Sequence, residues 1–325
     1  MTTDAKILSA LRANPDGVSG AQLAEQLAIS RAAVWSRIEE LRRVGFEIEA
    51  GPHFGYRLVD EPDALLADDL LSRLGVTQVV GRDIQVFEQT TSTNDVAEKL
   101  ARDGVKEGVA VFAESQTKGR GRLGRAWMSP LRKGLWFSVL LRPDLPPQET
   151  TQLTILSATA IRRAIKTVTG LSAEIKWPND LLLRGRKVAG ILTELSAELD
   201  RVRHVIVGIG VDVNQDAQGF PGELRKTATS LKIESGAEVS RPELAVEILR
   251  ELDHDYARLG PGKFSEVADE WEAACVTIGR NVTVHAGDRR FKGRAESLDD
   301  DGALLIRTEH GHLERVMGGD VILEK

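Results

Sequence analysis

The apolar positions of residues 5–45 repeat with the period of an α-helix and predict three short helices. Ser19 and Gln22 have the spacing of a capping box, which predicts the start of the second helix. Ser30 is a capping residue for the third helix, whose Val34 and Ile38 lie on one face. Two short helices joined by a tight turn are typical of a helix-turn-helix, whose second helix enters the major groove of DNA.

Alternating residues follow this unit and predict a hairpin. The segment 46–49 alternates, the segment 51–55 supplies turn residues, and the segment 56–58 is extended again. The helices and the hairpin together predict a winged helix, with a helical interaction module as the alternative. Ala28 lies in the turn, where glycine would better tolerate a left-handed backbone. The residues expected to contact DNA are Ser30, Arg31, Ala32, Ser36 and Arg37.

Strand and helix signals are mixed in the central part of the chain. Extended apolar runs predict strands at 109–113, 135–141, 174–177, 187–195 and 204–213. Apolar residues at helical spacing predict a long helix over 153–168. Residues 184–186 resemble a hairpin turn, so the strands beside it pair antiparallel. We therefore expect an α+β fold with a mixed or antiparallel sheet and helices on one side of it.

The last part of the chain has a different pattern, with short extended runs separated by turn residues. These runs, at 281–285, 303–306 and 321–323, predict a small β-barrel or sandwich. A polar segment that contains proline, 60–63, marks an earlier boundary. The chain of 325 residues is therefore expected to contain three domains: a winged helix-turn-helix over 1–62, a central domain over 63–274 and a β domain over 275–325.

Composition excludes several classes of protein. With 42% hydrophobic and 28% charged residues, the chain has the composition of a soluble globular protein rather than a disordered one. Its net charge of −6 argues against a surface coated with basic residues, so any phosphate binding must be local. The single cysteine, Cys275, fits a reducing compartment, and no signal peptide or membrane-spanning run is visible. We expect a cytoplasmic protein with no membrane partner.

The segment 116–133 is the most unusual stretch of the chain. It holds no acidic residue, and its basic residues are Lys118, Arg120, Arg122, Arg125, Arg132 and Lys133. The spacing Gly119-x-Gly121-x-x-Gly124 matches the dinucleotide-binding fingerprint, but the helix and the acidic residue that the fingerprint requires are missing. We interpret the segment as a loop whose glycines let the backbone approach a ligand and whose arginines bind phosphate or carboxylate oxygens. The alternative is a solvated basic loop.

Four other clusters carry polar groups. The segment 176–180 has the chemistry to orient a triphosphate and to hold Mg²⁺ through Asp180, or it forms a simple strand-end turn. Lys187 opens an apolar strand, where it is either a counter-charge in a desolvated site or a lysine that reaches water. In the segment 204–214 one face is glycine or polar and leaves a floor for a flat ligand or for a neighbouring helix. Residues 90–94 either cap a helix or present hydroxyls to a small polar ligand.

In their order and spacing, these segments resemble the biotin protein ligase family. The matching stretches are 92–94, 119–127, 176–180, 187–192 and 208–210. With its helix-turn-helix, the chain is similar to the members that act both as ligase and as biotin operon repressor. The resemblance implies a class II synthetase-like central domain and an SH3-like β-barrel at the C-terminus. It also implies that biotin and Mg-ATP give biotinyl-5′-AMP, whose biotin then passes to a lysine of the biotin carboxyl carrier protein of acetyl-CoA carboxylase.

The resemblance further implies roles for individual residues. Those expected to bind biotin are Ser92, Thr93, Asn94, Gln116, Gly119, Arg120, Gly121, Arg122, Lys187, Gly190 and Gly208. Those expected to bind ATP are Arg122, Arg125, Lys176, Asn179, Asp180, Lys187 and Asp212. Lys187, Arg122 and Arg125 are expected to be catalytic, and Asp180 to bind Mg²⁺. Asp212 departs from the asparagine of the bifunctional repressor, and a carboxylate there changes the local charge or binds metal more directly.

The expected partners follow from the same resemblance. They are the biotin carboxyl carrier protein, the operator DNA of biotin synthesis genes, and a second copy of the chain when biotinyl-AMP or DNA is bound. One alternative is a biotin-sensing repressor with weak or no ligase activity, which the intact arginine loop and Lys187 disfavour. The other is a lipoate protein ligase, which the N-terminal winged helix disfavours.

Overall fold

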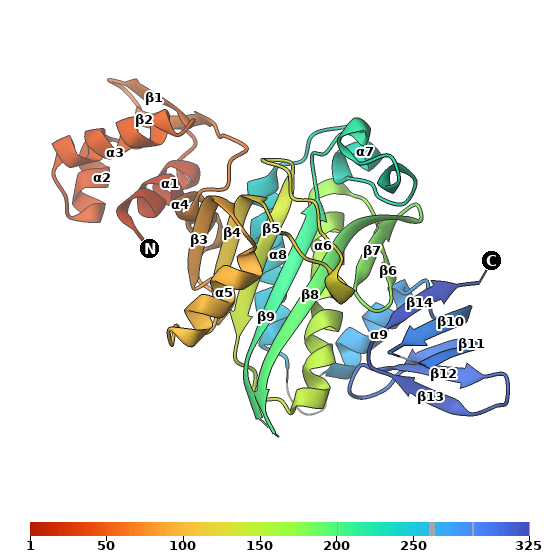
Figure 1. The fold of residues 1–325 in the computed structure, drawn as a ribbon. Coiled ribbons are helices and arrows are strands. Elements are labelled where there is room, and N and C mark those ends of the chain that lie inside the picture. The colour runs from red at the N-terminus through yellow and green to blue at the C-terminus, as the bar shows by residue number, and fades with distance from the viewer. Residues whose placement is uncertain (200, 260–263, 288, 325) are drawn as a thin grey trace.

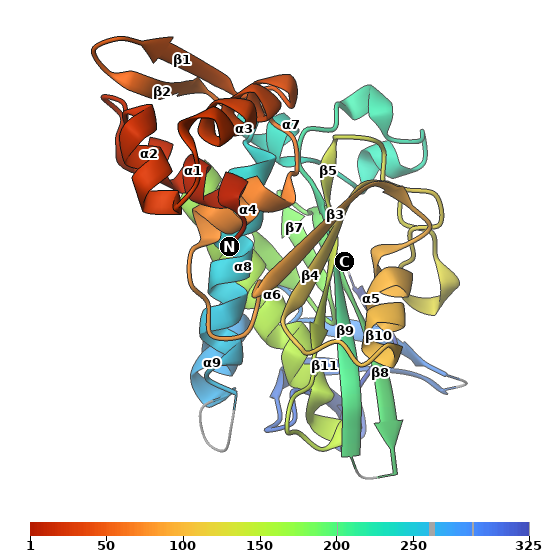
Figure 2. The same ribbon diagram turned by 90° about the vertical axis from the view of Figure 1, so that its left-hand side faces the viewer.

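A computed structural model describes residues 1–199, 201–259, 264–287 and 289–324. Figure 1 shows a helical N-terminal unit and a C-terminal sheet at opposite ends of a larger central sheet with its helices. Figure 2 shows the same arrangement from the side of the N-terminal unit. Among the residues described, no helix is both long and apolar enough to span a bilayer.

The N-terminal unit is a winged helix, as predicted. Its elements are α1 (Thr3–Ala13), α2 (Gly20–Leu27), α3 (Arg31–Arg43), and the hairpin of β1 (Glu47–Gly51) and β2 (Gly55–Asp60). Ser19 and Gln22 form the predicted capping box, in which each side chain accepts a hydrogen bond from the backbone N–H of the other. Ala28 is left-handed, with φ +54°, at the end of α2. The buried residues of this unit, such as Ile7 and Val34, form a cluster separate from the rest of the core.

A seven-stranded mixed sheet forms the centre of the molecule, in the order β3-β4-β5-β9-β8-β7-β6. Only β3 and β4 pair in parallel; the other neighbours are antiparallel. The strands are β3 (Asp83–Thr90), β4 (Val109–Gln116), β5 (Gly134–Leu141), β6 (Glu174–Lys176), β7 (Asp180–Leu183), β8 (Arg186–Glu198) and β9 (Arg201–Asp212). The helices are α4 (Ala67–Leu74), α5 (Thr93–Arg102), α6 (Thr151–Thr169), α7 (Leu231–Ser235), α8 (Arg241–Tyr256) and α9 (Phe264–Ala274).

Helices lie on both faces of this sheet, so the expectation of helices on one side was wrong. The larger core contains α6 and α8 on one face, where the rings of Phe112 and Phe137 stack with their centroids 4.7 Å apart. On the opposite face, Ala97 of α5 lies in a smaller cluster with Val111 and Ile206. Successive side chains of a strand point to opposite faces, which lets the almost wholly buried β4 and β5 serve both cores.

The C-terminal region is a five-stranded antiparallel sheet in the order β13-β12-β11-β10-β14. Its strands are β10 (Asn281–Ala286), β11 (Arg289–Leu298), β12 (Leu304–Thr308), β13 (Leu313–Val316) and β14 (Asp320–Leu323). The small β domain is therefore present, although the structure, over the residues it describes, pairs no strands that close it into a barrel. Val284 and Ile306 join Trp271 of α9 in the central core. The C-terminal sheet thus shares its core with the central domain.

Candidate active site and DNA-binding face

Three glycines of two neighbouring strands form the floor of the candidate site. Gly190 of β8 lies opposite Gly210 of β9, and Gly208 points to the same side. A Cβ on Gly210 would lie 2.6 Å from the indole of Trp127, and one on Gly208 would lie 2.2 Å from Asn94 Oδ1. Real Cβ atoms do not make contacts this close, so the glycines are needed for Trp127 and Asn94 to approach the sheet. The predicted floor is present, and side chains of the chain itself lie on it.

The start of α5 contributes a buried polar group beside this floor. The backbone N–H of Thr93 donates to Gln116 Oε1 over 2.8 Å, which joins α5 to the end of β4. Asn94 donates to Glu194 Oε2 over 2.8 Å, and the Ser138 hydroxyl lies 2.6 Å from Asn94 Oδ1. Ser92 occupies the N-cap position, but its side chain makes no cap hydrogen bond. The buried Asn94 and Ser138 are thus bonded to each other and to the half-buried Glu194, which favours a binding role over simple capping.

Two members of this group, Ser138 and Glu194, were missed by sequence reasoning. Ser138 is fully buried in β5, whose other residues between 134 and 141 are glycine or apolar. Glu194 interrupts the apolar run that begins after Lys187. A polar residue within a buried strand was the signal that could have identified Ser138.

The segment 116–133 folds back on itself above the floor. Trp127 N–H donates to Gly119 O over 2.9 Å, and Gly121 N–H donates to Arg125 O over 2.7 Å. A short 3₁₀ turn at Arg122–Gly124 forms the tip. The backbone pairing places Trp127 on the sheet at Gly210. The predicted loop, residues 116–133, is therefore a hairpin-like flap that Trp127 anchors to the floor.

The loop arginines reach three different parts of the molecule. Arg120 donates to Asp95 of α5 over 2.7 Å and also contacts Glu194. Arg122 donates to Asn179 Oδ1 over 2.9 Å and to the carbonyl of Gly319 over 3.1 Å. Burial lowers the pKa of the Arg122 guanidinium, although nearby carboxylates oppose this effect. The structure therefore brings Arg122 and Asn179 together, whereas Arg120 lies against α5 and β8.

Arg125 pairs with Asp320 at the start of β14. The C-terminal sheet thus meets the loop at two points, the carbonyl that Arg122 contacts and this carboxylate. A Cβ on Gly319, which has φ +134°, would lie 2.4 Å from the carbonyl of His285. Only glycine allows this close approach, which holds the contact point against β10. Sequence reasoning assigned no role to Asp320, since it is distant from the loop along the chain.

Lys187 lies at the centre of the site. Its ammonium is 2.6 Å from Asp180 Oδ1, an ion pair without the geometry of a hydrogen bond, and 5.1 Å from the ring centroid of Trp127. Asp212 lies on the same strand face as Gly210, 6% exposed. Burial raises the pKa of the Asp212 carboxyl well above its usual range, partly offset by Lys187. The predicted lysine therefore lies in an ion pair with Asp180 and near enough to the buried Asp212 carboxyl to act on it.

The remaining predicted nucleotide residues lie on the neighbouring strands. Lys176 pairs with Asp180 in the register of β6 and β7. Asn179 donates to the carbonyl of Ile191 over 2.7 Å, which holds it against β8. Within the described ranges, no group of three or more His, Cys, Asp or Glu side chains has the arrangement of a metal site. Mg²⁺ bound mainly by substrate phosphates and water needs only one or two carboxylates, and Asp180 fits that requirement.

A second candidate site lies on α3. Ser30 accepts a hydrogen bond from Ala33 N–H and caps the helix, and the other predicted DNA contacts, Arg31, Ala32, Ser36 and Arg37, are exposed. Trp35 lies among them and is 58% exposed. Sequence reasoning missed Trp35, although a large apolar residue outside the core register of the helix was a usable signal.

Comparison with known proteins matches all three regions of the chain. Family models match residues 4–57 (HTH domain), 86–212 (Biotin/lipoate A/B protein ligase family) and 277–324 (Biotin protein ligase C terminal domain). The Bifunctional ligase/repressor BirA of Bacillus subtilis is 40% identical, with 96% of this chain and 95% of that protein covered. The protein of the same name from Escherichia coli is 31% identical, with 97% and 96% covered.

A solved structure gives the same result. The biotin protein ligase from Aquifex aeolicus in complex with biotin and ATP aligns with a TM-score of 0.64 and 31% identity, over 75% of this chain and 99% of that one. The similarity in sequence extends over nearly the whole chain, and it includes both the ligase regions and the helix-turn-helix. The chain therefore belongs to the biotin protein ligase family.

Proposed function

We propose that the protein joins biotin to ATP as biotinyl-5′-AMP and then transfers biotin to a lysine of the biotin carboxyl carrier protein of acetyl-CoA carboxylase. The observation that carries this proposal is Lys187. Its ammonium lies over the glycine floor at Gly190 and over the Trp127 ring, and the buried Asn94 of α5 lies against the same floor at Gly208. A ligand with one apolar ring system, one polar head and one carboxylate matches these surroundings.

The chemistry requires cations between two anions. A biotin carboxylate oxygen attacks the α-phosphorus of ATP, a P–O bond forms, and pyrophosphate leaves. Both reactants are negative, so repulsion grows as they approach, and a fixed cation between them lowers the barrier. Lys187 is assigned to the carboxylate and α-phosphate, and Arg122 and Arg125 to phosphate oxygens. No covalent bond to the protein is needed.

Nucleotide and metal binding are assigned to the strands beside Lys187. Lys176, Asn179 and Asp212 would contact the nucleotide, and Asp180 would hold Mg²⁺. Bound Mg²⁺ neutralises phosphate charge. To bind it, Asp180 must share or give up its contact with Lys187, which frees the ammonium for the ligand. Breaking the Asp180–Lys187 ion pair therefore makes the carboxylate available to the metal and the ammonium available to the substrate.

The second step needs protection of the adenylate from water. Biotinyl-AMP is a mixed anhydride of a carboxylic acid and a phosphate. The amine of the carrier lysine attacks its acyl carbon, an amide bond forms, and AMP leaves. The flap over residues 116–133 has its own backbone pairing and two contacts with the C-terminal sheet, at Arg122 and Arg125. A flap held in this way excludes water from the anhydride.

One experiment tests the ligase proposal against the lipoate alternative. Purified protein is mixed with Mg-ATP, the carrier domain, and biotin or lipoate, and the carrier is weighed by mass spectrometry. We expect the mass increase of one biotinyl group and no lipoyl group. An unchanged carrier in the biotin sample would overturn the proposal, and a lipoyl adduct alone would support the lipoate alternative.

The same chain is proposed to repress biotin synthesis genes in the cytoplasm, with α3 in the major groove of operator DNA and a homodimer as the bound form. The exposed Arg31, Ser36 and Arg37 support this assignment, and Trp35 adds an apolar group for base edges such as thymine methyl groups. Gel-shift titration with and without biotin and Mg-ATP tests it. We expect ligands to increase DNA affinity. Equal affinity in both samples would support a ligase without a biotin-responsive repressor role.

A further inference from the structure

A buried arginine lies where the winged helix joins the central domain. The side chain of Arg241, at the start of α8, is fully buried. Its guanidinium contacts Asp63 Oδ2 at 3.0 Å and Glu114 Oε2 at 2.5 Å. Its backbone N–H donates to Asp63 Oδ1 over 2.8 Å. The segment 61–66, between β2 of the winged helix and α4, is the linker of the molecule. Arg241 thus joins this linker to β4 of the central sheet.

Glu114 connects this arginine to the substrate flap. It is two residues before Gln116, where the flap begins, and its backbone carbonyl accepts a hydrogen bond from Arg132 N–H near the end of the flap over 3.1 Å. Its Oε1 also accepts the backbone N–H of Leu65 in the linker over 2.8 Å. One glutamate therefore contacts both ends of the flap and the linker.

A second connection runs through the end of β9. The backbone N–H of Asn214 donates to the carbonyl of Lys133 over 2.7 Å, where the flap ends. The Asn214 side chain exchanges two hydrogen bonds with the backbone of Val239, two residues before Arg241, both of 2.9 Å. The flap exit and the start of α8 are therefore held together independently of Glu114.

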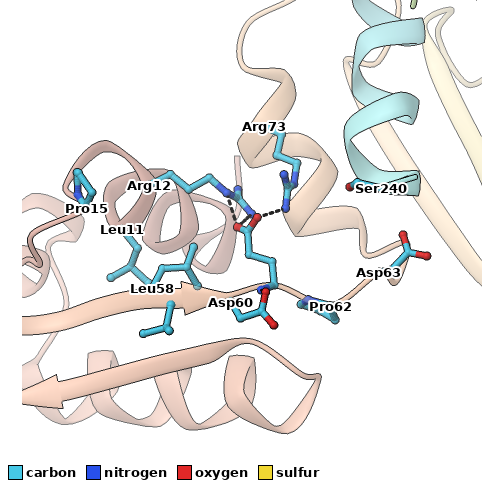
Figure 3. Close-up of a pocket in the computed structure, with 11 residues that line it drawn as sticks. Leu11, Arg12, Pro15, Leu58, Asp60, Pro62, Asp63, Arg73 and Ser240 are labelled. Carbon is cyan, nitrogen blue, oxygen red and sulfur yellow. Dashed lines mark hydrogen bonds and ion pairs between the residues drawn. The ribbon is translucent and has the colours of Figure 1, made fainter. Parts of the chain in front are cut away.

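On the other side of the linker, Glu61 contacts the winged helix. Arg12 of α1 donates to Glu61 over 2.7 Å, and Arg73 of α4 binds the same carboxylate. Figure 3 shows Arg12 and Arg73 converging above the linker, with Asp63 further along it and Ser240 at the start of α8. A hollow of about 450 Å³ lies beside this stretch, so the linker has open space on one side.

We propose that Arg241 is a positioning residue that couples ligand binding under the flap to the DNA affinity of the winged helix, through Asp63 of the linker and Glu114 of β4. A shift of the linker that removes Asp63 leaves a buried guanidinium with one carboxylate instead of two, which is costly. Ligand bound under the flap holds the segment whose end is bonded to the Glu114 carbonyl, and thereby favours the position of the linker that Glu114 and Arg241 hold. The proposal rests on the proposed ligase and repressor functions.

The electrostatics agree with a coupled arrangement. Burial alone would lower the pKa of the Arg241 guanidinium, but Glu114 and Asp63 together raise it above its usual value. The charge is therefore retained in the core beside both carboxylates. By linkage, any effect of the ligand on DNA affinity must appear equally as an effect of DNA on ligand affinity.

The test compares two aspartates that each bind an arginine. Asp63→Asn removes charge from the linker at a side chain that is 44% exposed, so the fold should tolerate it. Asp255→Asn removes charge from the wholly buried partner of Arg163, away from the linker, and is the harsher control for stability. For each full-length protein, the dissociation constant for a duplex selected by the wild type from a random library is measured with and without biotin plus Mg-ATP.

We expect the ratio of the two dissociation constants to fall at least fivefold in Asp63→Asn and to stay at the wild-type value in Asp255→Asn. Glu114→Gln, measured in the same way, should reduce the ratio as Asp63→Asn does. A wild-type ratio in Asp63→Asn would overturn the coupling role of Arg241, and so would an equal loss in Asp255→Asn. A wild type that binds DNA equally with and without ligand would instead overturn the biotin-responsive repressor function, and this proposal with it.

Discussion

Two sets of arginines in this molecule are proposed to bind phosphates, and their surroundings differ. On α3, Arg37 is 51% exposed and its ion pair with Asp4 has a length of 3.7 Å. In the flap, Arg122 is half-buried and is fixed between Asn179 and the C-terminal sheet. Exposed pairs contribute little and are screened by salt.

This difference has a consequence for selectivity. The arginines of α3 present charge directly to solvent, so they act on any nearby polyanion and depend strongly on salt. In the active site, the cations already have partners within the chain, so a ligand must replace those partners with its own oxygens in matching geometry. The first arrangement favours attraction at a distance, and the second favours discrimination. Five substitutions, three in the active site and two in the winged helix, test whether the two regions act separately; they follow from the largest expected effect to the smallest.

Lys187→Ala should have the largest effect. It removes the cation that lies beside Asp180 and over Trp127, and we expect biotin-dependent exchange of pyrophosphate into ATP to fall by about 10²- to 10³-fold. Lys232→Ala, which removes a half-buried ion-pair lysine outside the site, is the matched control and should retain exchange. Full exchange by Lys187→Ala would remove the catalytic role of this residue.

Gly210→Ala should disturb the floor itself. The new Cβ would lie 2.6 Å from the Trp127 indole, so the ring must move or the core must strain, at a cost of about 1–3 kcal/mol. We expect biotin affinity, measured by calorimetry, to fall about tenfold, since a tenfold change corresponds to about 1.4 kcal/mol. Gly222→Ala, which meets nothing within 4 Å, serves as the control. Unchanged affinity would contradict the assigned floor.

Arg31→Ala should separate the two kinds of arginine. Because Arg31 is exposed on α3, we expect DNA binding to weaken several-fold, and the slope of log affinity against log salt concentration to fall by about 1. Ligase activity should be unchanged. Lys226→Ala, which removes an exposed charge from the central domain, should leave the slope as it is. An unchanged slope in Arg31→Ala would argue against a phosphate contact.

Asp212→Asn tests the buried carboxyl of the active site. Burial raises the pKa of the Asp212 carboxyl above its ordinary 3.8, so the folded state keeps a proton that the unfolded state releases. Folding therefore loses stability as pH rises from about 4 toward the raised pKa. The free energy of unfolding of Asp212→Asn, relative to the wild type, should grow over this range in urea titrations at several pH values. A difference that stays constant with pH would contradict the shift.

Ala28→Gly should have the smallest effect and should be confined to the winged helix. Ala28 is left-handed, with φ +54°, which costs a non-glycine residue about 1–2 kcal/mol, while glycine loses part of that gain through chain entropy. We expect a gain of about 0.5–1 kcal/mol in unfolding free energy, with DNA affinity and ligase activity unchanged. A loss of stability would show that the turn is not strained.

Prediction from sequence succeeded where local pattern decides structure. The capping box at Ser19 and Gln22, the left-handed turn at Ala28 and the long helix now seen over Thr151–Thr169 follow from residues within a few positions of one another. Strand β5 was also located almost to the residue, because its apolar run ends in polar or turn residues. No range was predicted for β7, although the hairpin turn expected at 184–186 implies a strand before it, since four residues carry too little periodicity.

The active site shows the limit of local pattern. The glycine spacing of β9 predicted a floor, but only the folded chain shows that Trp127 lies on Gly210, since the two are far apart in sequence. Ser138, Glu194 and Asp320 were not identified, because each acts by meeting residues from another element. The basic residues of the flap were visible in the sequence, but the side chains of this chain that they pair with were not.

The sequence by itself determined the winged helix, the mixed sheet, the C-terminal strands and the residue types that can hold phosphate and carboxylate. These depend on period, caps and glycine positions, which act over short distances along the chain. Only the tertiary structure decided that α5 covers the second face of the sheet and that Arg241 joins the linker to β4. Such contacts depend on long-range packing and on the pairing of buried charge, which no local pattern records.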